Sequence, residues 1–295
     1  MRFGGSMRSS TSRRKQRGIT LVEMLIVIGI IVFLIALLLP AARRSIEAGR
    51  QVVCLNHMRQ IAQAALMYCH DNDGTFPGIC GVDPEYGGPL SYEWIYADYL
   101  YNPPFNDATK SPIMRYLGVH TLGGTSADGQ RLSDLSVLRC PSDDWDSHSW
   151  VSHPSYGPYK FSYAINAWTA SWQPGFLPGT YYPVPAMRLV QVKIPSQTIF
   201  FFEEQGRFID DGTFNIMIRP VRWSESVSYA HDVNRSGFDP PNPQNAGFAP
   251  DQLDNARRTN VVFCDGHGEF VTEAFANEQM HYDPRFDPAT SPTAP

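Results

Sequence analysis

An abrupt change of polarity at Gly18 constrains this chain more than any other feature. Residues 1–18 carry six Lys and Arg side chains and no acid, whereas residues 19–39 are apolar except for Thr20 and Glu23. An apolar run of that length forms a helix of roughly 30 Å, which is long enough to cross a bilayer. A carboxylate inside such a segment costs a few kcal/mol to insert and therefore marks Glu23 as a candidate functional residue.

The residues around this change match a known processing site. The segment Gly18-Ile19-Thr20-Leu21-Val22-Glu23-Met24-Leu25 resembles the cleavage site of type IV prepilins and type II secretion pseudopilins. The resemblance implies that prepilin peptidase cuts between Gly18 and Ile19 and methylates the new N-terminus. It also implies that Glu23 contacts the N-terminus of a neighbouring subunit during assembly. Pro40 matches the proline that often closes the apolar segment in that family.

Two other interpretations of the N-terminus share the basic leader and the apolar run. A secretory signal peptide has only about 7–15 apolar residues and a small-residue cleavage site, neither of which fits here. A plain signal anchor fits better, and it shares the topology in which the basic N-terminus stays in the cytoplasm. Only Gly18 and Glu23 distinguish the prepilin interpretation from that anchor.

The apolar run continues into a helix of different character. We predict a transmembrane and assembly helix over residues 19–40, bent by Pro40, and an amphipathic continuation over residues 41–70. Apolar residues in the continuation recur at alternating spacings of four and three residues, which places them in one stripe along a helix. The stripe consists of Cys54, Met58, Ile61, Ala65 and Tyr68. Turn residues at 71–74 predict the end of the helix.

The rest of the chain predicts a small sheet with long loops. Gly, Pro and aromatic residues are plentiful, which favours short strands and turns. Residues 198–202 read as a strand, residues 215–218 as a weaker one, and Asp265-Gly266 between two strand-like runs indicates a hairpin. We therefore predict an α+β fold, in which the N-terminal helix packs on a small antiparallel sheet. The globular domain would span residues 71–282, followed by a disordered tail at 283–295.

A second resemblance covers most of the soluble part. Its landmarks are residues 54–61, residues 139–143, the segment 162–166 and residues 260–267. They resemble a class of pilin-like proteins abundant in planctomycetes, which carry a C-terminal motif of His, nine residues, then Asp-Gly. Asp265 and Gly266 match the end of that motif, but Asn255 stands where the family has its histidine. An amide preserves hydrogen bonding more readily than acid-base or ligand chemistry.

The five cysteines are Cys54, Cys69, Cys80, Cys140 and Cys264. In the predicted topology all of them lie outside the cytoplasm, where disulfides form, and the odd number leaves at least one thiol unpaired. Cys54 and Cys69 would be over 20 Å apart on a continuous helix, too far for a disulfide. A bond between Cys54 and Cys140 would tie the helix to the domain, and we treat it as a hypothesis.

The sequence predicts no resident metal or cofactor. Cys264 and His267 could form one corner of a zinc site, but structural zinc needs four ligands and no second pair accompanies them, although His231 is available. The interpretation of this segment as a hairpin turn is preferred. Calcium is the weak alternative, with Asp251, Asp254 and Asp265 as candidate oxygen ligands.

Nothing in the sequence supports catalysis, and we expect no enzyme activity. There is no Gly-x-Ser-x-Gly motif, and neighbouring residues such as Glu203 and Glu204 point to opposite faces of a strand. Aromatic side chains are concentrated in residues 150–185. They could bind a sugar or a partner protein, or they could pack in the core.

The charge balance bears on partners. The formal net charge is −5, and loss of the six leader cations brings it to −11, so we expect no nucleic-acid binding.

The expected function is a structural pseudopilin or minor-pilin-like subunit, for secretion or a surface role. Its partners would be prepilin peptidase, other pilin-like subunits, the inner-membrane assembly machinery and the lipid bilayer. The alternative is a single-pass membrane-anchored binding protein that uses residues 150–185.

Overall fold

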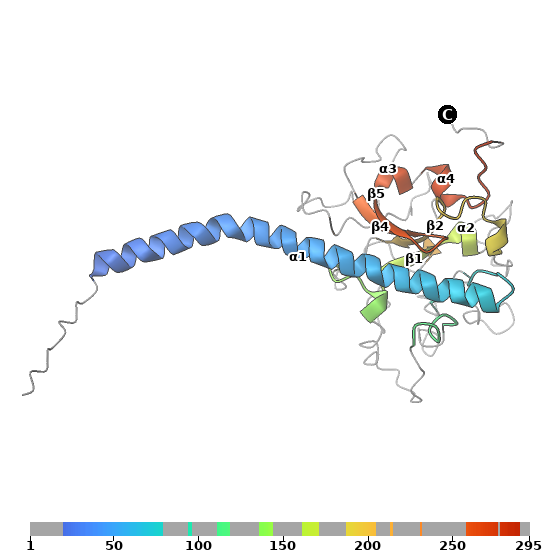
Figure 1. The fold of residues 1–295 in the computed structure, drawn as a ribbon, viewed down its shortest axis with the longest axis horizontal. Coiled ribbons are helices and arrows are strands. Elements are labelled where there is room, and N and C mark those ends of the chain that lie inside the picture. Colours follow the sequence, from blue (N-terminus) through green and yellow to red (C-terminus); the bar gives the residue numbers. More distant parts are fainter. Residues whose placement is uncertain are drawn as a thin grey trace, which may run out of the picture. The chain divides into compact units, whose positions relative to one another are not determined.

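Figure 1 shows the fold of the chain in a computed structural model. It describes residues 20–78, 94–95, 111–118, 136–143, 161–170, 187–204, 213–214, 231, 258–276 and 278–289. The chain divides into two compact units, Met1–Ser45 and Ile46–Pro295. The second unit is called the head below.

One long helix, α1, spans Leu21–Asp71 and takes part in both units. Pro40 lies inside it, as predicted, without ending it. Between Leu21 and Leu39 its large apolar side chains are 49% to 81% exposed. Among the described residues, α1 is the one helix whose length and composition would let it cross a membrane.

The C-terminal part of α1 has the amphipathic character that the sequence predicts. Every residue of the apolar stripe is buried in the head, from Cys54 to Tyr68. The helix ends where the turn residues are. The amide of Gly74 donates to the carbonyl oxygen of Cys69 at 2.8 Å, and Asp73 and Gly74 adopt left-handed backbone angles that allow this reversal.

The head contains the predicted antiparallel sheet, and the α+β prediction is confirmed. Four antiparallel strands follow the order β1 (Tyr163–Asn166), β2 (Ile199–Glu203), β4 (Arg258–Phe263) and β5 (Gly268–Thr272). A two-residue strand, β3 (Thr213–Phe214), pairs with β1 in parallel at the edge. The predicted strand at residues 215–218 lies outside the described residues.

The hairpin around Asp265-Gly266 is confirmed. Strands β4 and β5 pair directly, and the amide of Phe263 donates to the carbonyl oxygen of His267 at 2.9 Å across the turn. Gly266 has a φ of 89°, which favours glycine at this position. Its neighbour Gly268 lies close to α1, where a side chain would meet Leu55 and Arg59.

Each face of the sheet has its own cluster of buried side chains. One face meets α1 through Tyr163, Ile165, Phe201 and Val262, while the opposite face packs with the short helices α3 (Glu273–Ala276) and α4 (Gln279–Tyr282). Figure 1 shows α3 and α4 on the side of the sheet away from α1. A register shift between Ile199 and Phe201 places both Phe200 and Phe201 in the cluster facing α1.

A buried amide links the end of β1 to distant chain segments. Asn166 donates from Nδ2 to the carbonyl oxygens of Ile199 and Tyr282 at 2.7 and 2.9 Å. Its Oδ1 accepts from the amide of Trp168, in the short helix α2 (Ala167–Ala170), at 3.0 Å. The 3-10 turn η4 (Leu189–Gln191) then leads toward β2.

Residues 283–289, the first part of the predicted disordered tail, make defined contacts with the head. The amide of Lys193 donates to the carbonyl oxygen of Pro284 at 2.8 Å, and the guanidinium of Arg285 lies 5.4 Å from the centre of the Trp168 ring. The segment has few apolar residues, but backbone hydrogen bonding and a cation–π contact hold it against the head.

Candidate functional site

The N-terminal end of α1 forms a reciprocal capping box. Glu23 Oε2 accepts hydrogen bonds from both the backbone amide and the hydroxyl of Thr20, each at 2.8 Å, and the Glu23 amide donates back to Thr20 Oγ1 at 3.3 Å. Thr-x-x-Glu is the sequence signature of this motif. Sequence reasoning singled out Glu23 but missed its role as a helix cap, although the Thr20–Glu23 spacing would have revealed it.

The structure does not test the predicted processing site. Gly18 and Ile19 lie outside the described residues, so their predicted roles stay predictions. Glu23 lies two residues into α1 and Pro40 lies further along the same helix. The described part of this site is therefore a capped helix end followed by an exposed apolar surface.

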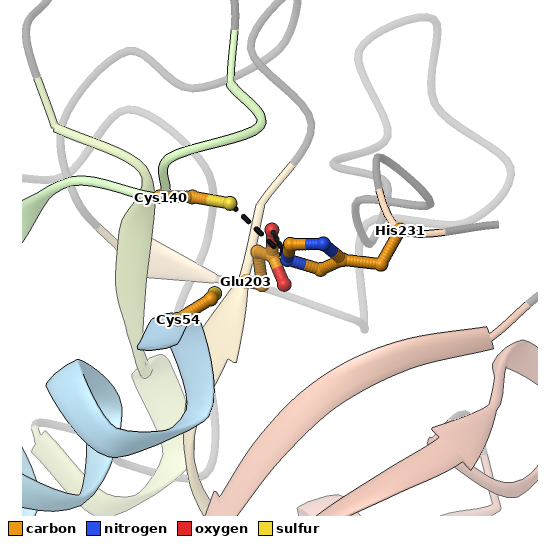
Figure 2. Close-up of side chains that lie close together, drawn as sticks. All are labelled: Cys54, Cys140, Glu203 and His231. Carbon is orange, nitrogen blue, oxygen red and sulfur yellow. Dashed lines mark hydrogen bonds and ion pairs between the residues drawn. The ribbon is translucent and has the colours of Figure 1, made fainter. Parts of the chain in front are cut away.

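A second site, which we call the buried thiol–histidine cluster, lies inside the head (Figure 2). Its members are Cys54, Cys140, Glu203 and His231, and one potential ligand atom of each lies within 4.8 Å of all the others. The Nε2 atom of His231 is 3.2 Å from the sulfur of Cys140 and 3.3 Å from Oε1 of Glu203. All four residues are buried.

Four separate parts of the fold position these side chains. Cys54 begins the buried stripe of α1, Cys140 follows a short 3-10 turn, and Glu203 ends β2. Glu203 pairs with Tyr163 of β1, on the face that meets α1. His231 comes from a segment that is otherwise outside the described residues.

A set of outer partners surrounds the buried thiol–histidine cluster. The Tyr163 hydroxyl donates to Cys54 Sγ at 3.4 Å, and the Ser142 amide donates to Cys140 Sγ at 3.4 Å. Asn260 Nδ2 donates to Glu203 Oε2 at 3.0 Å, and His231 Nδ1 lies 2.7 Å from Glu47 Oε1. Each member of the cluster thus has a polar neighbour.

Burial and mutual contact shift the pKa values of the cluster. Burial raises the pKa of the Cys54 thiol, while contact with Cys54 together with burial raises the pKa of Cys140. Burial alone would lower the pKa of His231, but its contacts with Cys140 and Glu203 outweigh burial and raise it. Burial would raise the pKa of Glu203, but contact with His231 lowers it. The directions of these pKa shifts favour protonated thiols and an ion pair between His231 and Glu203.

The predicted Cys54–Cys140 disulfide remains a prediction. The structure brings the two residues together, as the hypothesis requires, and both are free thiols. Sequence reasoning mentioned Glu203 and His231 as well, but it assigned them to other, rejected hypotheses.

The other metal candidates do not converge among the described residues. Cys264 is buried, whereas the ring of His267 contacts the carboxylate of Asp265 in the hairpin turn. Asp251, Asp254 and Asn255 lie outside the described residues, so calcium binding and the role of Asn255 stay untested.

The described part of the aromatic-rich segment belongs to the core. Phe161, Tyr163 and Trp168 are all buried. The remainder of residues 150–185 lies outside the described residues. No described aromatic side chain of this segment offers a binding surface.

These features define a class and a family. A capped apolar helix that continues into the head and packs on a small antiparallel sheet is the architecture of a pilin-like protein. Residues 13–39 match the family described as Prokaryotic N-terminal methylation motif. Residues 41–215 match the family described as Protein of unknown function (DUF1559), and the chain belongs to it. No curated protein and no solved structure matches the chain. The motif and the apolar helix together fit membrane anchoring through α1, with a single span among the described residues.

Proposed function

We propose that this protein is a pilin-like structural subunit that is processed by prepilin peptidase and assembled through the N-terminal half of α1. The observation that carries the proposal is the methylation motif, which ends on an apolar helix whose side chains are left exposed by the described chain. A surface of that kind needs a bilayer or other subunits to cover it.

Processing would occur at the leader. The peptidase would cleave between Gly18 and Ile19, remove six cations, and methylate the amine of Ile19. Before cleavage the cations would keep the N-terminus in the cytoplasm and place the head on the other side of the membrane.

Assembly would depend on Glu23. In the subunit its carboxylate caps its own helix through Thr20. In a filament the amine of a neighbouring subunit would lie against the same carboxylate, and this pairing would offset the cost of burying both charges. The exposed apolar side chains of Leu21–Leu39 would then pack on the same segment of other subunits, in a filament for secretion or a surface role.

The intact mass and N-terminal sequence of the protein from native membranes test the processing step. We expect a chain that begins at Ile19 and carries a methyl group on its amine. A bulky substitution, Gly18→Val, should retain the higher mass of the precursor. A native chain that still carries residues 13–18 would contradict the proposal and favour a membrane-anchored binding protein.

A pair of substitutions tests the assembly step. Both Glu23→Ala and Thr20→Ala break the capping box, which costs the helix end about 1 kcal/mol. Only Glu23→Ala removes the carboxylate. We expect Glu23→Ala to be inserted and cleaved but to lose most filament or cross-linked multimer, whereas Thr20→Ala should keep most of it.

The two variants decide between capping and pairing as the role of the carboxylate. Equal losses in Glu23→Ala and Thr20→Ala would mean that only the cap matters. Wild-type multimer yield in Glu23→Ala would refute the assembly role outright. The cleaved mass of each variant, measured in the same samples, separates an assembly defect from a processing defect.

A further inference from the structure

We propose that Cys54, Cys140, Glu203 and His231 form a buried structural zinc site that fastens α1 to the head. The proposal is independent of processing and filament assembly, because all four ligands lie within the head. Figure 2 shows their side chains converging from different segments of the chain.

The donor atoms have the spacing that a small tetrahedral ion needs. The two sulfurs, Oε1 of Glu203 and Nε2 of His231 lie within 4.8 Å of one another, with contacts of 3.2 and 3.3 Å at the imidazole. Zinc bonds to sulfur, nitrogen and oxygen imply donor separations of about 3.3–3.8 Å in a tetrahedron. Small side-chain movements would therefore bring all four donors to one ion.

Without an ion, the contacts at the centre of the cluster are incomplete. Nε2 of His231 can carry only one hydrogen, yet it lies between a sulfur and a carboxylate oxygen. Oε1 of Glu203 is fully enclosed, and among the described residues it has the ion-pair contact with His231 Nε2 at 3.3 Å but accepts no hydrogen bond. One imidazole N–H is therefore shared between a sulfur and a buried carboxylate oxygen, which leaves the electrostatic compensation of that oxygen partial. A dication at the centre would satisfy both atoms together.

The outer partners are arranged as around a metal. A zinc-bound histidine usually donates its other ring N–H to a carboxylate, and His231 Nδ1 lies 2.7 Å from Glu47 Oε1. The Asn260 amide holds the second carboxylate oxygen of Glu203 at 3.0 Å. The sulfur of Cys54 accepts a hydrogen bond from the Tyr163 hydroxyl, and the sulfur of Cys140 accepts one from the Ser142 amide. Each of the four ligands therefore has a partner that fixes its orientation.

The donor set selects the metal and its role. Thiolates with an imidazole in tetrahedral geometry favour zinc, whereas calcium and magnesium prefer oxygen ligands alone. Four protein ligands leave no open position for water or substrate, and a closed site of this kind is structural. On binding, both thiols would lose their protons, and His231 would be neutral, with its remaining proton on Nδ1 facing Glu47.

The site would join segments that are far apart in the sequence. Cys54 lies on the helix that also carries the membrane anchor, Glu203 ends a central strand, and Cys140 and His231 belong to connecting segments. A cross-link that closes long loops stabilises the native state by restricting the unfolded chain. Zinc would thus couple the anchor helix to the sheet.

The metal content of the full chain tests the proposal. The protein would be purified in detergent under reducing conditions without added metal and measured by mass spectrometry of the elements. We expect about one zinc per chain, and cobalt substitution should give thiolate-to-metal charge-transfer bands. Less than about a tenth of a zinc per chain, with no uptake of added zinc or cobalt by the reduced protein, would refute the site. A Cys54–Cys140 disulfide in peptide maps of the native protein would also refute it.

Matched thiol variants separate the site from general effects of losing cysteine. Cys54→Ser with Cys140→Ser should abolish zinc binding, whereas Cys69→Ser with Cys264→Ser removes two other buried thiols and should retain it. If the first variant does not fold, the wild-type protein provides the decisive measurement. A strong chelator should lower its melting temperature, and added zinc should restore it. A melting temperature unmoved by the chelator, in protein found free of zinc, would overturn the proposal.

Discussion

The two halves of α1 are one continuous helix with opposite surroundings. Between Leu21 and Leu39 the large apolar side chains are at least 49% exposed, whereas the stripe from Cys54 to Tyr68 is at most 8% exposed. The first half is apolar on every side, and the second half has one apolar face that the sheet covers.

This difference shows which contacts stabilise each half of α1. The stripe is matched by side chains of the same chain, so the free energy of burial is gained when the head folds. The first half has no such match among the described residues, and its burial free energy is gained from lipid or from other subunits. Substitutions in the two halves should therefore appear in different measurements.

The largest effect should come from a matched pair of isoleucines. Ile61 is fully buried in the stripe, and Ile31 is 49% exposed in the first half. We expect Ile61→Ala to lower the free energy of unfolding of the head by about 2–5 kcal/mol, through lost burial and a cavity. Ile31→Ala should change it by less than about 0.5 kcal/mol. Denaturant unfolding in detergent, followed by the fluorescence of buried Trp94 and Trp168, measures both.

Equal losses from the two isoleucine variants would break the comparison, because the first half would then be stabilised by the head. A measurement of membrane insertion provides the opposite control, in which a substitution in the first half should matter and the stability of the head should not change. The charged substitution Ile31→Arg should cost about 3 kcal/mol of insertion free energy while leaving head unfolding unchanged.

A pair of glycines gives a smaller effect that sharpens the comparison. A side chain at Gly268 would meet Leu55 at 2.9 Å and Arg59 at 3.2 Å, both on α1. A side chain at Gly49 in α1 would meet nothing within 4 Å. We expect Gly268→Ala to destabilise the head by about 1–3 kcal/mol, because the side chains of Leu55, Arg59 and Val262 must shift to make room for the methyl group. Gly49→Ala should stabilise the helix by up to about 1 kcal/mol.

The same unfolding measurement checks the glycines. Unchanged stability in Gly268→Ala would mean that the side chains of Leu55, Arg59 and Val262 move aside at no cost, and tight packing of α1 at this position would be refuted. A loss in Gly49→Ala as large as that in Gly268→Ala would mean that the position marks a packed surface.

Local sequence patterns were enough to predict much of the fold. The apolar stripe, the turn at residues 71–74 and the hairpin at Asp265-Gly266 each follow from residues close together in the sequence, and the structure confirms them. The bulge at Phe200 does not follow from such a pattern. It depends on how β2 pairs with β4, which is a contact between distant segments.

The buried thiol–histidine cluster was beyond the reach of sequence patterns for the same reason. Its members come from four segments and lack the paired spacing of common zinc motifs. Glu203 reaches the cluster because the end of β2 faces α1 beside Tyr163. The contacts of residues 283–289 could not be predicted from composition either, because they are backbone hydrogen bonds and the contact of Arg285 with the Trp168 ring, not apolar burial.

The smallest effect concerns the hydrogen bond between Tyr116 and Asp71 at the C-terminal end of α1. The Tyr116 hydroxyl donates to Asp71 Oδ2 at 2.7 Å, and this hydrogen bond, with a smaller contribution from His70, lowers the pKa of Asp71. Removal of the hydroxyl in Tyr116→Phe should raise the pKa of Asp71 toward its usual value, measurable by carbon-detected NMR titration of the labelled carboxylates.

The sign of the stability effect follows from that pKa. Because the folded state holds the pKa of Asp71 below its unfolded value, the contribution is present above about pH 4 and is lost as pH falls through the folded pKa. The melting temperatures of wild type and Tyr116→Phe should therefore differ slightly near neutral pH and converge in acid. Asp71→Asn removes the titrating group, so adding Tyr116→Phe to it should abolish the pH dependence of the difference. A difference that persists in acid would mean that Tyr116 stabilises the head through packing, like the residues of the buried stripe, and not through its hydrogen bond to Asp71.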